Sequence, residues 1–192
     1  MQKIQDVSVA IATCLALSLG AGSQARADGT FVQFDAAQNT SDTVFSMSRG
    51  KVSFSANFSD YDGGWSTGAA VTRDFALEGI GTLKLGPSIG RTLADDNWRL
   101  GARVGLERYT PTSFGHVFML GQYNTIDQDW FAVFQAGNRS GLGLELSAGG
   151  SDTYSERTIA VTQKIDGGPV SIRAGWRALA KEAFVGISIN TY

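Results

Sequence analysis

One pair of residues in this sequence could carry out nucleophilic catalysis. The single histidine, His116, follows Ser113 closely, and a serine hydroxyl beside an imidazole base is the minimum that such chemistry requires. Ser113 lies in a Thr-Pro-Thr-Ser segment and not in the Gly-x-Ser-x-Gly turn that presents a hydrolase nucleophile. We therefore predict a non-catalytic protein with no catalytic residue, and keep a lipid-modifying hydrolase as the enzymatic alternative.

Metal, cofactor and nucleic-acid binding find little support in the composition. The only cysteine is Cys14, and one histidine without further cysteines does not make a zinc ligand set. The glycines do not form a phosphate-binding loop before a helix. The chain has 16 basic and 18 acidic residues and no basic block, which argues against nucleic acid as a partner. We predict no cofactor and no metal site.

Charged residues recur instead on one face of alternating segments. Residues 98–107 carry arginine, glycine and glutamate at odd positions and Trp, Leu, Ala, Val and Leu at even positions. Successive side chains of a strand point to opposite faces, so this segment has one wholly apolar face and one face of glycine and charge. The same pattern predicts strands over residues 51–58, 83–90, 141–149 and 170–178.

Weaker alternation fills the intervals between these segments. It predicts strands over 66–76, 114–124, 130–137, 156–165 and 184–191, joined by short turns rich in Asp, Asn, Gly and Pro. Residues 31–36 and 43–49 could add one hairpin. The expectation is an all-β, single antiparallel up-and-down barrel of about ten strands, between eight and twelve.

Three features favour a transmembrane barrel over a soluble one. The strands have about nine to eleven residues, the length that crosses a bilayer at a tilt. Glycine weakens an exposed soluble strand but makes room inside a narrow lumen. Trp98, Trp130 and Trp176 lie near strand ends, where aromatic girdles form. A soluble secreted or periplasmic β-barrel binding protein is the alternative.

The N-terminus has the order of a secretory signal. Lys3 precedes an apolar run from Val7 to Leu19, and Ala25-Arg26-Ala27 provides small residues at a cleavage site. We predict a signal peptide over residues 1–27 and one barrel domain over residues 28–192. This run is shorter than the about 20 apolar residues of a membrane anchor, and no apolar stretch after residue 27 is long enough for a spanning helix.

The chain from residue 28 onward resembles the small bacterial outer-membrane β-barrels in its strand length, its alternation and its terminal aromatic residue, Tyr192. Tyr192 is in phase with Gly186, Ser188 and Asn190 instead of with the apolar face, which departs from that pattern. Asp152-Thr153-Tyr154 before an alternating strand is faintly similar to barrels associated with cellulose export. The resemblance implies a Gram-negative cell envelope, with outer-membrane lipid, lipopolysaccharide and the barrel-assembly machinery as partners, and a cell-surface polysaccharide as a further candidate.

With a periplasmic N-terminus, one end of the barrel gathers the acidic loops. Solvated loops are the simplest interpretation, and carboxylates that bind divalent cations bridging lipopolysaccharide are the alternative. The outer-loop acidic residues are Asp60, Asp62, Asp95, Asp96, Asp127, Asp129, Asp152 and Glu156.

The polar faces of the strands would line the lumen, where charges must pair or meet water. The predicted lumen charges are Lys84, Arg99, Arg103, Glu107, Glu145, Lys164, Arg173 and Arg177. If they form ion pairs, they plug a structural or surface-interaction barrel, which is our main interpretation. Because basic residues outnumber acidic ones in this set, a narrow anion-selective channel for small anions or acidic sugars is the alternative.

Overall fold

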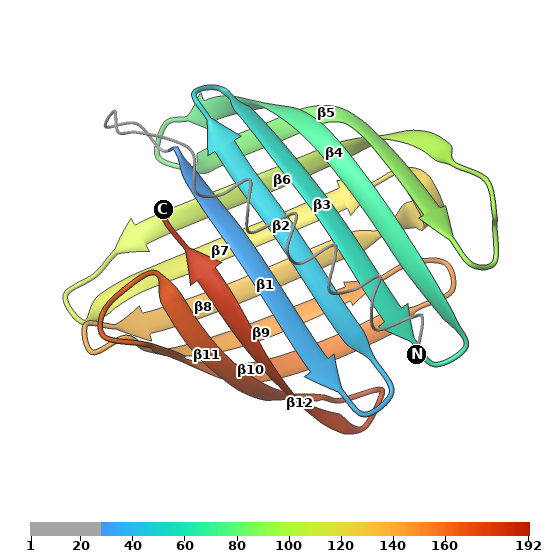
Figure 1. Ribbon diagram of the computed structural model, residues 1–192. Coiled ribbons are helices and arrows are strands. Elements are labelled where there is room, and N and C mark those ends of the chain that lie inside the picture. The colour runs from blue at the N-terminus through green and yellow to red at the C-terminus, as the bar shows by residue number, and fades with distance from the viewer. Residues whose placement is uncertain (1–27) are drawn as a thin grey trace.

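Alternating side chains produce strands along almost the whole described chain. The computed structural model describes residues 28–192, which form a closed antiparallel barrel (Figure 1). The predicted signal peptide, residues 1–27, lies outside the described residues. The strands are β1 (Gly29–Ala37), β2 (Ser41–Arg49), β3 (Val52–Tyr61), β4 (Gly64–Leu77), β5 (Gly81–Thr92), β6 (Arg99–Pro111), β7 (Gly115–Asn124), β8 (Trp130–Asn138), β9 (Leu142–Gly150), β10 (Ser155–Lys164), β11 (Val170–Arg177) and β12 (Glu182–Asn190).

The barrel has twelve strands, whereas about ten was the central expectation. The difference is the N-terminal hairpin β1–β2, whose strands the sequence left open. Strand β1 pairs with β12, so that Asp35 lies opposite Gly186, and β2 pairs with β3. Without this hairpin β3 and β12 would be unpaired edges, and unpaired backbone groups in a bilayer cost several kcal/mol each.

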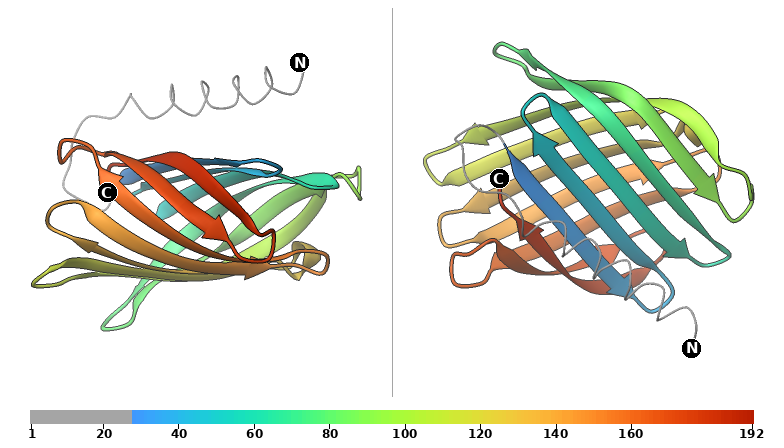
Figure 2. Two further views of the ribbon diagram at one scale, coloured as in Figure 1. Left: turned by 90° about the horizontal axis from the view of Figure 1, so that it is seen from below. Right: turned by 45° about the horizontal axis from the view of Figure 1, so that its top comes forward.

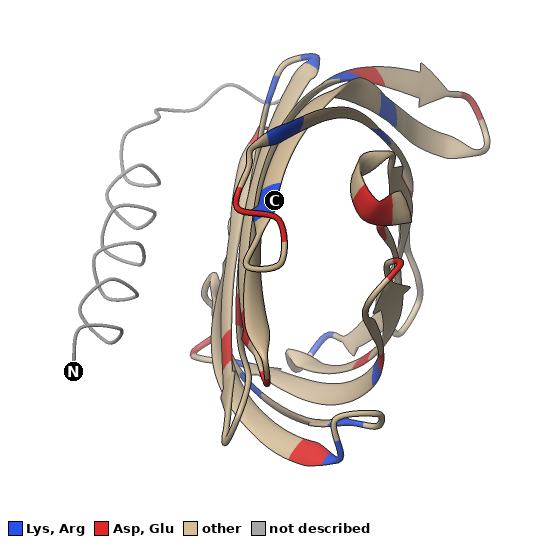
Figure 3. Ribbon diagram, turned by 90° about the vertical axis from the view of Figure 1, so that its right-hand side faces the viewer, with Lys and Arg blue, Asp and Glu red and all other residues tan. Residues whose placement is uncertain are grey.

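Two ends of the barrel can be told apart by the chain itself. Gly29 and Asn190 lie side by side at one end, which we call the terminal end, and the opposite end is the loop end (Figures 1 and 2). The strands run obliquely around the barrel (Figure 1), and the barrel has an oval section when viewed along its length (Figure 3). Among the described residues, no helix has the length and apolarity needed to cross a membrane.

The apolar side chains point outward. Leu100 is 83% exposed, Val185 is 67% exposed and Ile172 is 55% exposed, while Arg173 and Glu145 on the inward faces of their strands are buried. Among the described residues, no large side chain is fully buried in the manner of a soluble core. A soluble barrel places its apolar face inside, so this inverted distribution excludes the soluble alternative and fits a surface solvated by lipid.

Tryptophans mark one border of this apolar band. Trp130 begins β8, Trp176 lies near the end of β11, and Trp98 immediately precedes β6, all at the loop end and all exposed. Trp65 of β4 lies at the same end. The predicted girdle is therefore present, and it contains one tryptophan more than the alternation had singled out. Such rings sit at the level of the lipid headgroups.

Short turns connect the strands where glycine provides unusual backbone angles. The hairpin between β3 and β4 turns at Asp62-Gly63, and Gly63 has a φ of 87°, which lies in the left-handed region. Gly50 between β2 and β3 has a φ of 61°. The longest connection, residues 93–98, lies at the loop end, where outer-membrane barrels place their extracellular loops.

Candidate functional site

The inward face of the barrel, here called the lumen wall, carries the charged residues. The ladder registers place all eight predicted lumen residues on this face, because residues paired directly across neighbouring strands share a side. Glu107 and Lys84 come together, as do Arg173 and Glu145. Arg99 lies at the loop end, and Lys164 is exposed at the terminal end and makes no ion pair within residues 28–192.

The first group, the Arg173 cluster, is centred on a buried arginine of β11. Its guanidinium holds the Glu145 carboxylate with two hydrogen bonds, of 2.9 and 3.0 Å, and its Nε lies 2.8 Å from an Asp35 oxygen. It also donates to Gln33, and Glu145 accepts from Gln135. One cation thus faces two carboxylates.

Glycine makes this arrangement possible. A Cβ at Gly186 would occupy the place of the Asp35 carboxylate and would lie 3.0 Å from Cγ of Arg173. Because Gly186 lies opposite Asp35 across the closing β1–β12 ladder, barrel closure and the ion cluster depend on the same residue.

Arg177 extends the network towards the loop end. It donates to Asp42 of β2 at 2.7 Å and lies 3.5 Å from a Glu182 oxygen. Glu182 also accepts from the Asn39 backbone N–H at 3.1 Å, which fastens the β1–β2 turn. The Phe184 ring lies between the two arginines, with the guanidinium carbons of Arg173 and Arg177 at 5.6 and 5.2 Å from its centroid.

The second group, the Lys84 cluster, lies on β3 to β6. Lys84 Nζ is 2.9 Å from Glu107, 3.8 Å from Asp74 and 3.1 Å from the Ser53 hydroxyl. Ser53 in turn donates to Asp74 at 2.7 Å. All of these groups lie on nearby strands, so the cluster follows the wall.

Arg103 differs from the other lumen arginines. It donates to the Ser55 hydroxyl at 2.7 Å, and its buried Nε has no partner within the described chain. No ion pair of residues 28–192 includes it. The carboxylate that interacts electrostatically with Arg103 is that of Asp129, which lies just before β8. Burial raises the pKa of Asp129, and Arg103 opposes that shift.

The expectation that basic residues outnumber acidic residues on the lumen wall is wrong. The lumen wall carries further carboxylates that the alternation did not assign to it. Strands β1 and β2 were left open, β4 was a weak strand, Glu156 was assigned to a loop, and Glu182 precedes the strand expected over 184–191. These carboxylates belong to Asp35, Asp42, Asp74, Glu156 and Glu182. Their period-two phase with small or polar neighbours was the available signal.

The predicted acidic loop residues do gather at the loop end, but several of them are neutralised there. Asp95 and Asp127 pair with Arg99, and Asp96 pairs with Arg91. Glu156, assigned to a loop, is the second residue of β10, and its carboxylate accepts hydrogen bonds from the backbone N–H groups of residues 179 and 180 at 2.8 and 2.9 Å. Asp60 lies in β3, while Asp62 and Asp152 lie in turns. Within residues 28–192, no group of three or more His, Cys, Asp or Glu residues is placed to hold a metal ion.

The opening at the loop end is narrowed from two sides. Tyr61, at the end of β3, stacks on Tyr154 of the β9–β10 loop with ring centroids 5.6 Å apart, although these elements lie far apart around the barrel. Gly64 faces Tyr61, and a Cβ there would lie 3.0 Å from its ring. Burial raises the pKa of the Tyr154 phenol, which therefore stays neutral.

The β7–β8 connection folds inward as the short helix η1 (Ile126–Gln128), visible inside the oval in Figure 3. Side chains of Ile126 and Thr125 would lie 2.6 and 2.7 Å from a Cβ at Gly101. Glycine at position 101 therefore seats this loop against the lumen wall.

His116 does not form a catalytic pair. It is the second residue of β7, and its ring stacks on Tyr109 with ring centroids 5.6 Å apart. Within the described chain, no hydrogen bond joins its imidazole to Ser113. At the C-terminus, the Tyr192 hydroxyl lies 3.1 Å from Ser48 Oγ on the lumen wall, in keeping with its polar phase.

Comparison with known proteins shows similarity of fold but no similarity of sequence to a known family. No protein-family model matches the sequence, and no curated protein sequence matches it. Among solved structures, the barrel is similar to a KdgM porin in complex with disordered oligogalacturonate, with a TM-score of 0.53 and 11% identity over 85% of this chain and 99% of that one. A KdgM porin structure gives a TM-score of 0.52 with the same identity and coverage.

The chain is an outer-membrane β-barrel with a porin-like fold. The closed barrel, its lipid-facing apolar band and its tryptophan girdle place it in that membrane. The similarity to cellulose-export barrels has no counterpart among these structural neighbours.

Proposed function

We propose that this protein is a narrow channel of the outer membrane that passes small acidic solutes, with acidic sugars as the substrate class. The observation that carries the proposal is Arg103, an inward-facing cation without an ion-pair partner among the described residues. Arg103 is half-buried, and a partly desolvated cation without a partner is costly unless water or an anion solvates it. A solute-filled lumen supplies both.

The arrangement of the other charges supports a lined channel better than a plug. The ion pairs join strands at most three positions apart around the barrel, as in Arg177 to Asp42, whereas the opposite wall is six positions away. The Arg173 cluster and the Lys84 cluster thus each run along the lumen wall, on different parts of its circumference. Our main sequence-based interpretation, a lumen closed by its own charges, is less well supported for this reason.

The structural neighbours point to the same class of solute. One of them was solved with oligogalacturonate, an acidic oligosaccharide. At 11% identity, that likeness supports the architecture, and the solute class for this chain rests on Arg103 and its surroundings.

Conductance in planar bilayers tests the channel. The purified barrel should give small, steady, anion-selective current steps in a salt gradient. Arg103→Gln should lower the anion-to-cation permeability ratio about fivefold, because a charge near 4 Å from an ion in water contributes about 1 kcal/mol. Galacturonate should reduce the chloride current of the wild type more than an uncharged sugar of equal size.

Arg108→Gln is the matched control, since Arg108 is exposed and, within residues 28–192, its side chain donates only to the Gly79 carbonyl oxygen at the terminal end. Its selectivity should equal that of the wild type. A barrel that folds but never conducts, with or without the change at Arg103, would refute the channel and restore the plug.

The stacked tyrosines make a separate prediction. Tyr154→Ala removes the ring that meets Tyr61 at the loop end, so the single-channel conductance should rise, whereas Tyr154→Phe keeps the stack and should conduct like the wild type. Phe134→Ala removes an exposed aromatic ring from the lipid-facing wall and serves as the control. Equal conductance of Tyr154→Ala and wild type would show that this stack does not limit the current.

A further inference from the structure

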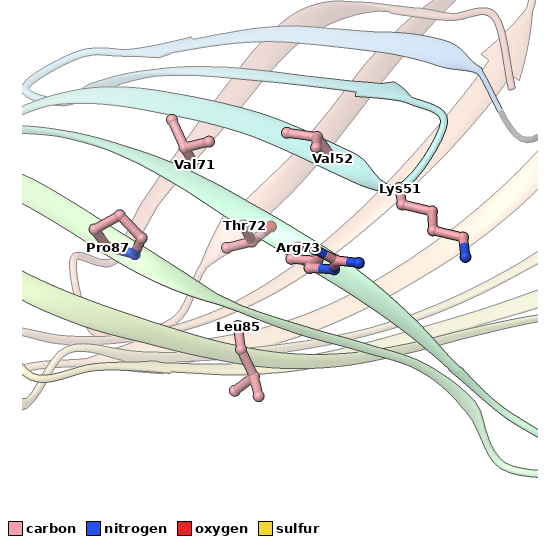
Figure 4. Close-up of a pocket in the computed structure, with 7 residues that line it drawn as sticks. All are labelled: Lys51, Val52, Val71, Thr72, Arg73, Leu85 and Pro87. Atoms are coloured by element: carbon pink, nitrogen blue, oxygen red, sulfur yellow. The ribbon is translucent and has the colours of Figure 1, made fainter.

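A groove of about 410 Å³ runs along the lipid-facing wall over β3, β4 and β5. Its lining is mostly apolar, with Val52, Val71, Leu85 and Pro87 beside the hydroxyl-bearing Thr72, and two cations complete it (Figure 4). These cations are Lys51, in the β2–β3 turn, and Arg73, on β4. The groove lies outside the lumen and has no part in the proposed conduction.

An interruption of the sheet accompanies the groove. The Cα pairing of β4 with β5 skips Val71 and Thr72 opposite Gly86 and Pro87, although it continues on both sides. Proline has no N–H to contribute to a ladder. Instead of a fully paired surface, the outer wall presents a depression with apolar sides at this point.

The two ends of the groove differ in chemistry. Arg73 lies opposite Val52 in the β3–β4 ladder, level with the β2–β3 turn that holds Lys51 and therefore at the terminal end. Figure 4 shows Val71 and Pro87 at the other end of the groove, farther along the strands. The cations thus stand where lipid headgroups begin, and the apolar part extends into the hydrocarbon band.

Neither cation is neutralised by a carboxylate of the described chain. Both are exposed, no ion pair within residues 28–192 includes Lys51 or Arg73, and Arg73 has only the Phe75 ring, 5.9 Å from its guanidinium carbon. An arginine on the lipid face is unfavourable at depth and tolerated near the interface. A phosphate of the same leaflet would compensate its charge.

We propose that this groove is a binding site for one anionic phospholipid. Its phosphate lies between Lys51 and Arg73, and one acyl chain packs on Val71, Leu85 and Pro87. The choice of phospholipid over lipopolysaccharide rests on a periplasmic terminal end, since lipopolysaccharide occupies the outer leaflet.

Native mass spectrometry of the detergent-released barrel tests the site. Titrated with phosphatidylglycerol, the wild type should retain one lipid, and Lys51→Gln/Arg73→Gln should weaken that binding at least about tenfold through loss of two charge-assisted contacts. Val71→Trp keeps both cations but fills the groove, and it should weaken binding as well.

Arg139→Gln is the control, because Arg139 is a cation in another turn of the terminal end and lies away from the groove. Three results would overturn the proposal: equal retention by the double variant and wild type, equal retention of phosphatidylcholine and phosphatidylglycerol, or preferential retention of lipopolysaccharide. Full competition by glycerol phosphate would also overturn it, since a bare headgroup does not use the apolar lining. Unboiled gels check that each variant is folded.

Discussion

Arg173→Met should destabilise the barrel by about 3–5 kcal/mol, the usual cost of removing one partner from a buried ion pair. Arg173 is the only cation in contact with the buried carboxylates of Asp35 and Glu145 within the described chain. Without it, two like charges remain buried close together. Urea unfolding in detergent micelles, followed by the shift of the folded band on unboiled gels, measures the loss.

Two variants make this result specific to the cluster. Arg103→Met removes an inward arginine that has no ion-pair partner in residues 28–192, so it should cost much less. Combining Arg173→Met with Asp35→Asn and Glu145→Gln should recover most of the stability, because no uncompensated charge then remains. If Arg173→Met and Arg103→Met unfolded at the same urea concentration, the Arg173 cluster would have no special structural role.

Val104→Arg should sharply reduce the amount of folded barrel in the outer membrane. Val104 faces outward, and arginine on the lipid face costs about 2–4 kcal/mol at the bilayer midplane. Gln122→Arg is the matched control, because Gln122 lies on the lumen wall of the next strand, opposite Gly105. Membrane fractionation with heat-modifiability gels compares the two.

Arginine is thus introduced once on the lipid-facing side and once on the lumen side of the same wall, at nearly the same level. Gln122→Arg should assemble almost normally, since Gly105 leaves space beside it and the lumen wall is polar. Equal assembly of the two arginine variants would contradict the assignment of the apolar face to lipid.

The strands of the barrel could be predicted because their signal is local. In residues 98–107 and 170–178, apolar and polar residues alternate so regularly that both the strand and its two faces follow from the period of two. The strands β6 and β11 occur where they were expected. The N-terminal hairpin was harder, because Phe31 shares the inward face with Gln33 and Asp35, which blurs the contrast between the faces.

The candidate site was predictable as a face but not as a set of contacts. Alternation placed Arg173 and Glu145 on the polar side of their strands. The structure brings them together across β10, which separates β9 from β11. Asp35, which completes the cluster, comes from the opposite end of the chain. Its contact with Arg173 exists only because β1 closes on β12 in one register, with Gly186 leaving room for the carboxylate.

Periodicity along the chain is a property of neighbours in sequence, and it was sufficient for the all-β barrel class, the lipid-facing side chains and the polar wall. Strand number, ion partners and the exposed groove at Pro87 depend on closure and register, which join residues distant in sequence. A shift of the ladder changes every cross-strand partner while the composition stays the same. For that reason the unpaired state of Arg103, on which the proposed function rests, became visible only in the closed barrel.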